Sequence, residues 1–212
     1  MVSANVAGRD LKSVVHQIKE KIDDTIQLPE NYHIQYGGQF ESEERASKIL
    51  LLTSLMALLI IFLLLYQEFK NIKLAGIVFL NLPLALIGGV LSIWFTGRIM
   101  SIPSIIGFIT LFGIATRNGI LLVSRYQALQ NQGVALYETV IKGSLDRLNP
   151  ILMTALTTAL ALIPLAITGD LPGNEIQSPM AIVILGGLLS STLLNIFIVP
   201  AVYYISNVRK ER

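Results

Sequence analysis

The chain has 212 residues, of which 53% are hydrophobic and 14% charged, and its mean hydropathy is +0.64. A soluble domain of this length cannot cover so much apolar sequence with polar surface, so the composition indicates an integral membrane protein. The net charge of +2 is too small to indicate nucleic-acid binding. Because the sequence has no cysteine, disulfides, thiol catalysis and thiolate metal sites are excluded.

Residues 1–47 are predicted to be the end of a soluble α+β subdomain outside the membrane. Residues 2–6 have the pattern of a strand, residues 10–26 have helical apolar spacing, and residues 33–36 form a second strand candidate before a Gly-Gly turn. A β-α-β piece of this size cannot bury its own core. We therefore expect it to pack on sequence outside this chain, and we expect the chain to be the C-terminal part of a longer protein.

Five apolar runs are long enough to cross a bilayer, which takes about 20 residues. They cover residues 49–66, 74–95, 102–123, 151–168 and 180–205. The predicted fold class is an α-helical polytopic membrane protein. Its transmembrane bundle spans residues 48–206 and is followed by a tail at 207–212, and an amphipathic helix at 134–148 is expected to lie along the membrane surface.

The distribution of basic residues predicts the orientation of these spans. Eight of them fall on the side shared by the first loop, the third loop and the C-terminus: Lys70, Lys73, Arg125, Lys142, Arg147, Arg209, Lys210 and Arg212. The opposite short loops hold only Arg98. Since positive charge is retained on the cytoplasmic side, we expect a cytoplasmic C-terminus and an N-terminal segment outside.

Small and polar residues recur at helical spacing within the spans. Such faces allow helices to approach closely and to hydrogen-bond in lipid. We predict helix-packing roles for Gly88, Gly113, Gly187, Ser191 and Asn195. For each of these faces, tight packing is favoured over a transport role.

Arg117 is the only charged residue within the five apolar runs. A charge at such depth costs about 2.5 to 3.5 kcal/mol on insertion scales and usually faces the protein interior with a partner. The alternative is snorkelling, because Arg117 lies about 10 Å from the cytoplasmic end of its run. A guanidinium has five donors to satisfy, and Asn118 and Thr154 are candidates to accept from it.

Three stretches of the spans together resemble the resistance-nodulation-division efflux permeases. They are residues 113–123, GIATRNGILLV; 146–154, DRLNPILMT; and 186–194, GGLLSSTLL. By this resemblance, the five apolar runs correspond, in order, to the last five of the twelve spans of that family. Residues 4–11 and 36–41 resemble the end of its second large periplasmic loop.

Finer detail resembles the heavy-metal efflux branch of that family. Arg117 and Asn118 stand where drug-efflux members typically have Lys-Asn, and residues 173–179 and 37–41 read GNEIQSP and GGQFE. One position departs from the family pattern, since Asn149 precedes the proline where Arg is more usual. This departure weakens only the contact that the family's Arg would be expected to make at this position on the cytoplasmic side.

The resemblance implies a proton-driven antiporter of the bacterial inner membrane, not an enzyme. It implies a homotrimer that works with a periplasmic adaptor and an outer-membrane channel, needs no cofactor and draws on the proton motive force. Carboxylates on a span absent from this chain would carry protons. Arg117 would be the basic residue of the proton relay and Thr154 its hydroxyl partner, with Asn118 adjacent. The exported ion would be a divalent or monovalent metal cation.

Two alternatives stay open at this stage. The first is a permease of the same superfamily that exports drugs or another substrate. The second is a truncated membrane fragment with a structural or assembly role and no transport. An enzyme is not supported, since the sequence has no P-loop or zinc-protease pattern, and His16 and His33 lack a second ligand at metal spacing.

Overall fold

The computed structural model describes residues 11–25, 29, 34, 36, 39–97, 100–169, 171, 173–174 and 176–211. The chain divides into two compact units, Met1–Leu52 and Thr53–Arg212. The domain boundary expected between residues 47 and 48 stays a prediction.

In the first unit, helix α1 covers Leu11–Thr25. Its bounds agree with the helical pattern at 10–26. The strand predicted at 2–6 and most of the one at 33–36 lie outside the described residues, and Ile34 and Tyr36 have no regular secondary structure. In the described part of the chain no strand is present, so the predicted β-α-β piece is not seen.

The remaining helices are apolar, and all of them except α3 and α4 have 30 residues or more. They are α2 (Gln39–Phe69), α3 (Ile72–Phe79), α4 (Asn81–Phe95), α5 (Ile102–Asn131), α6 (Leu136–Ile167) and α7 (Gln177–Glu211). Taken over their described residues, they provide five stretches with the length and composition to cross a membrane, with α3 and α4 forming one of them. This number agrees with the sequence prediction.

The second span is broken at Leu80, close to Pro83, a residue type that indicates a bend within the run at 74–95. Pro83 lies four residues after Phe79, and its ring excludes the backbone hydrogen bond that Phe79 would otherwise accept. Before this break, the side chain of Asn71 caps α3 by accepting from the backbone N–H of Lys73 at 2.9 Å.

The amphipathic stretch at 134–148 does not form a separate surface helix. Most of it is the first half of α6, which runs without interruption from Leu136 to Ile167 and contains Pro150 and Pro164. A short turn joins α5 to α6, and Gly133 adopts a φ of +81° there, a conformation that glycine reaches without steric cost. A separate helix at 134–148 is therefore not seen, and its expected location along the membrane surface stays a prediction.

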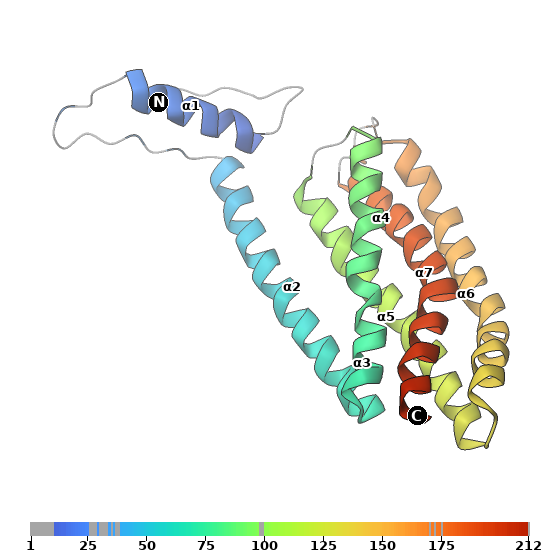
Figure 1. The fold of residues 1–212 in the computed structure, drawn as a ribbon. Coiled ribbons are helices and arrows are strands. Elements are labelled where there is room, and N and C mark those ends of the chain that lie inside the picture. Colours follow the sequence, from blue (N-terminus) through green and yellow to red (C-terminus); the bar gives the residue numbers. More distant parts are fainter. Residues whose placement is uncertain are drawn as a thin grey trace. The chain divides into compact units, whose positions relative to one another are not determined.

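Helix α7 is the centre of the second unit, since α4, α5 and α6 all pack against it (Figure 1). Figure 1 also shows that the C-terminal end of α7 lies at the same end of the unit as the start of α3 and the α5–α6 turn. Two apolar cores hold the helices together. One surrounds Tyr126 and Tyr203, and the other surrounds Leu82 and Leu111.

Candidate functional site

Arg117 lies in the interior of α5 and points away from the packed side of that helix. The neighbouring residues Ala115, Asn118 and Gly119 are buried, whereas Arg117 is exposed together with Thr110 and Gly113, which precede it by seven and four residues. Since residues four and seven apart share a helix face, α5 presents one continuous open face that carries its only mid-span charge. No hydrogen bond or ion pair of Arg117 is found among the described residues.

Asn118 follows Arg117 about 100° around the helix, on the buried side of α5. Its side chain is only 3% exposed, and its amide Nδ2 has no hydrogen-bond partner within the described structure. An unpaired buried amide costs roughly 1 to 3 kcal/mol, so a donor left in this state next to Arg117 is a candidate for a functional contact.

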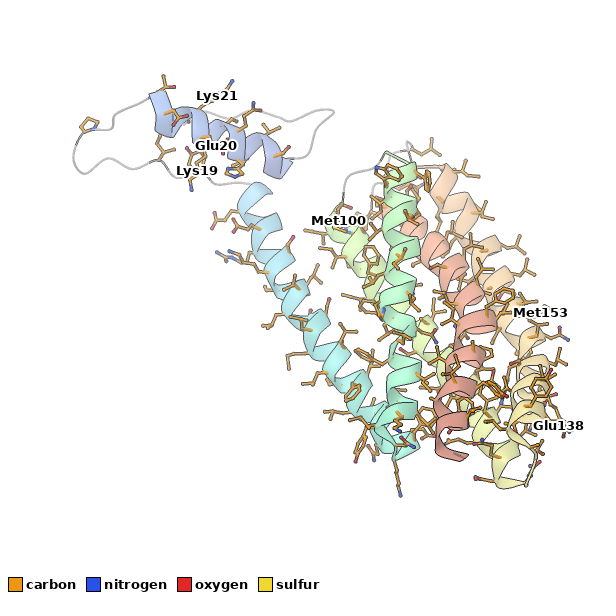
Figure 2. All side chains as sticks on the ribbon, in the orientation of Figure 1. Lys19, Glu20, Lys21, Met100, Glu138 and Met153 are labelled. Carbon is orange, nitrogen blue, oxygen red and sulfur yellow. The ribbon has the colours of Figure 1, made fainter. Side chains whose placement is uncertain are left out.

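Thr154 lies on α6 and is half-buried. Its hydroxyl donates to the carbonyl of Pro150 at 2.8 Å, in the same helix. Thr157 makes equivalent bonds to the carbonyls of Met153 and Thr154. Figure 2 shows Met153 on the outer side of α6, where its side chain is 66% exposed. The structure therefore places Arg117 and Asn118 side by side on α5 but shows no bond between them and Thr154.

The first half of α6 carries a second arginine that the sequence interpretation assigned to a surface helix. Arg147 is half-buried, and its Nε is buried without a hydrogen-bond partner in the described structure. Arg147 precedes Thr154 by seven residues, so both lie on one face of α6. This seven-residue spacing was visible in the sequence, and no bond of Arg147 to the candidate site is found in the described structure.

Four of the five residues predicted to pack helices lie on α4 or α7 and are buried there. Gly88 lies against Ser190 and the carbonyl of Gly186, and Gly187 lies against Leu111 of α5, so that a Cβ at either glycine would clash. Ser191 and Asn195 are also fully buried.

Asn195 joins α7 to α4 through a buried hydrogen bond. Its Oδ1 accepts from Asn81 Nδ2 at 2.9 Å, and its own Nδ2 donates to the carbonyl of Ser191 at 2.8 Å. Interhelical amide bonds of this kind stabilise helix pairs in lipid. The pairing of Asn81 with Asn195 required the three-dimensional structure.

Gly113 is the exception among the predicted packing residues. It is exposed, and nothing in the described structure lies within 4 Å of the position that its Cβ would occupy. The predicted packing of Gly113 is therefore not seen within this chain. Its place on the open face of α5, four residues before Arg117, is the physical reason.

The described residues contain no group of three or more His, Cys, Asp or Glu side chains that could hold a metal ion. Nor do the five apolar runs predicted from the sequence contain any Asp or Glu. A carboxylate partner for Arg117 is therefore not supplied by those runs.

Residues 1–207 match the sequence profile of the AcrB/AcrD/AcrF family. The chain belongs to this family of resistance-nodulation-division permeases, as its sequence motifs predicted. With its five long apolar helices, it is a multi-pass membrane protein.

Several relatives are named for heavy-metal efflux. The chain is 41% identical over 212 residues to the cobalt-zinc-cadmium resistance protein CzcA of Cupriavidus metallidurans, covering 100% of this chain and 20% of CzcA. It is 38% identical to the nickel and cobalt resistance protein CnrA of the same organism, covering 94% of this chain and 18% of CnrA. It is 32% identical to the cation efflux system protein CusA of Escherichia coli, covering 96% of this chain and 20% of CusA.

A solved structure agrees with these relatives. The crystal structure of a heavy metal efflux pump superposes with a TM-score of 0.83 at 35% identity, over 96% of this chain and 20% of the pump. The predicted similarity to the heavy-metal branch is thereby confirmed. The chain spans about a fifth of the length of the relatives it matches.

Proposed function

We propose that this chain is part of a proton-driven permease that exports heavy-metal cations, and that Arg117 is the basic residue of its proton relay. One observation carries the proposal: a guanidinium lies in the middle of a membrane-spanning helix, on an open face, without a partner among the described residues. A charge at that depth requires a partner, and the five apolar runs contain no carboxylate to provide one.

The chemistry of arginine fits this role. A guanidinium stays protonated in proteins, so it does not carry the proton itself. It holds a nearby carboxylate in the charged form, since an opposite charge within about 4 to 6 Å favours ionisation. When a proton neutralises that carboxylate, the ion pair is released and the balance between two helix positions changes. The carboxylate would belong to another part of a whole permease.

Asn118 and Thr154 would complete the hydrogen bonding around this pair. Asn118 brings an unpaired amide donor that lies directly beside Arg117 in the sequence. The hydroxyl of Thr154 donates to the carbonyl of Pro150, which leaves its oxygen lone pairs available as acceptors. Both groups are polar, and neither changes charge when a proton passes.

The names of the relatives support a metal cation as the substrate rather than a drug. The whole permease would be a homotrimer in the inner membrane that delivers the cation to a periplasmic adaptor and an outer-membrane channel. The balance of basic residues along the chain supports a cytoplasmic C-terminus.

The test is resistance of cells that produce the whole permease. We expect the wild-type protein to confer resistance to one or more of zinc, cobalt, nickel and copper, and Arg117→Ala to abolish it at unchanged protein level. Arg117→Lys is the matched control, because it keeps the charge and is expected to keep part of the resistance. Resistance to drugs alone would contradict the metal assignment. Full metal resistance with Arg117→Ala would contradict the relay.

A reporter fusion tests the orientation separately. We expect a reporter active only in the periplasm to be silent when fused after Arg212, and to be active when inserted in the loop between α4 and α5. The reverse pattern would contradict the proposed orientation.

A further inference from the structure

An ion pair joins α5 to α6 near the turn that connects them. Arg125 donates from Nε to Asp146 Oδ2 at 2.9 Å and from Nη2 to the same oxygen at 2.6 Å. The two side chains are 31% and 37% exposed, so the pair is partly shielded from solvent. Because the planar guanidinium places both donors on one acceptor, the contact fixes direction as well as distance.

Other side chains connect the helices at the same end of the unit. Tyr126 Oη and Ser144 Oγ are 2.6 Å apart, and the ring of Tyr126 lies so close to Gly143 that a Cβ there would clash. The rings of Tyr126 and Tyr203 are 4.7 Å apart, and Tyr203 Oη donates to Gln130 Oε1 at 2.9 Å. Side chains of α5, α6 and α7 are therefore bonded together at this end.

The ion pair sets the register between the two helices that carry the candidate relay. The two helices run in opposite directions from a short turn. Arg117 lies eight residues before Arg125, and Thr154 lies eight residues after Asp146. At about 1.5 Å per residue, both are displaced about 12 Å from the ion pair in the same direction across the membrane. The register therefore puts Arg117 and Thr154 at the same depth.

Pro150 lies between Asp146 and Thr154, within the continuous helix α6. A proline has no N–H, so the carbonyl of Asp146 lacks its usual helical partner, and helices bend most readily at such positions. Residues 152–167, which follow this point, include no buried residue in the described structure. The ion pair of Asp146 therefore lies immediately before this weak point of α6, on the side of the α5–α6 turn.

We propose that Arg125 and Asp146 are a positioning pair that holds α5 and α6 in the register that keeps Thr154 level with Arg117. This inference rests on the proposed role of Arg117 and Thr154, and it adds two residues outside the relay. The pair acts through the helices and does not itself bind the proton or the cation.

Charge exchange in the whole permease tests the pair. Arg125→Asp and Asp146→Arg are each expected to lower metal efflux by about fivefold, the upper range for a partly exposed ion pair. The double variant, with both changes, is expected to restore most of that loss. Lys142→Ala is the control, because Lys142 is exposed on α6 and forms no ion pair within the described structure. Single reversals that leave efflux unchanged, or a double variant that is no better than either single one, would overturn the proposal.

Cross-linking measures the register between α5 and α6 independently of transport. These 212 residues contain no cysteine, so in a whole permease whose other cysteines are replaced, Cys is placed at 117 and, in turn, at 151, 154 and 158. We expect a bifunctional thiol reagent to give its highest yield with 154, and Arg125→Ala to spread the yield over all three positions. An unchanged yield pattern in both Arg125→Ala and Asp146→Ala would overturn the positioning role. A permease that transports no metal but shows the expected pattern would refute the proposed function alone.

Discussion

Small and polar residues occur both where α4 contacts α7 and on the open face of α5. They are packed in the first region and exposed in the second. Along the first, glycines lie against backbone and the buried amides of Asn81 and Asn195 bond to each other. Along the second, Gly113 has open space around it and Arg117 has no partner in the described structure. A small or polar residue in a membrane helix therefore indicates an interhelical contact, and the structure decides whether that contact is made within this chain.

The two regions also differ in whether their buried polar groups have hydrogen-bond partners. Between α4 and α7, Ser92 Oγ donates to the carbonyl of Ile182 at 2.9 Å, which closes the contact. Beside Arg117, the buried Nδ2 of Asn118 is unpaired within the described residues. Because an unpaired buried donor costs free energy, the first region is built for stability and the second retains capacity for a further partner.

The largest expected change in stability is at Gly88. A methyl group there would meet both Ser190 and the carbonyl of Gly186, and the backbone cannot move aside without separating α4 from α7. We expect Gly88→Ala to lower the free energy of unfolding by about 1 to 3 kcal/mol, the usual cost of overpacking. Denaturation of the purified chain in mixed detergent micelles measures this.

Gly113→Ala is the matched control for Gly88→Ala. Its added methyl group meets open space, so the gain in helix propensity, up to about 1 kcal/mol, should leave the stability unchanged or raise it. Equal destabilisation by the two substitutions would mean that the contrast between the regions is wrong.

A smaller loss of stability is expected when the hydrogen bond between the Asn81 and Asn195 amides is removed. Asn81→Ala should cost about 0.6 to 1.7 kcal/mol, the range of interhelical hydrogen bonds in membrane proteins. Asn195→Ala should cost more than this, because it also removes the bond to the Ser191 carbonyl. In a double-mutant cycle, the two losses should add to more than the loss in the double variant. Strict additivity would show that the two amides are not coupled.

The smallest change in stability is expected at Thr154. Thr154→Val removes a hydroxyl that donates within its own helix, so the free energy of unfolding should change by less than about 0.5 kcal/mol. Thr157→Val is the control, because its hydroxyl makes the same kind of bond one turn later. In the whole permease only Thr154→Val should reduce metal efflux. An equal loss with Thr157→Val would remove the specific role of Thr154.

Much of the fold was predictable because hydropathy and helix length follow directly from the bilayer. The five spans, the α1 helix and the burial of Gly88, Gly187, Ser191 and Asn195 all follow from local spacing. Pro83 indicates a bend in the second span, but the place of the break at Leu80 and the continuity of α6 were not predicted. Both depend on how a proline is accommodated, and the sequence pattern does not contain this information.

The site was only partly predictable for a different reason. The sequence identifies Arg117 as a lone charge, but not which way the helix turns it. Its exposure depends on the burial of Ala115, Asn118 and Gly119, which is a property of packing between helices. The partial burial of Arg147 was not predicted either, because the stretch around it was interpreted as a surface helix.

The most direct measurement is metal uptake into inside-out vesicles that contain the whole permease and are driven by an imposed pH gradient. We expect the wild-type protein to accumulate the cation and to collapse part of the gradient. We expect Arg117→Ala to do neither, although it is present at the same level and still binds the cation. Gradient-driven accumulation by Arg117→Ala at the wild-type rate would show that Arg117 does not couple proton movement to transport.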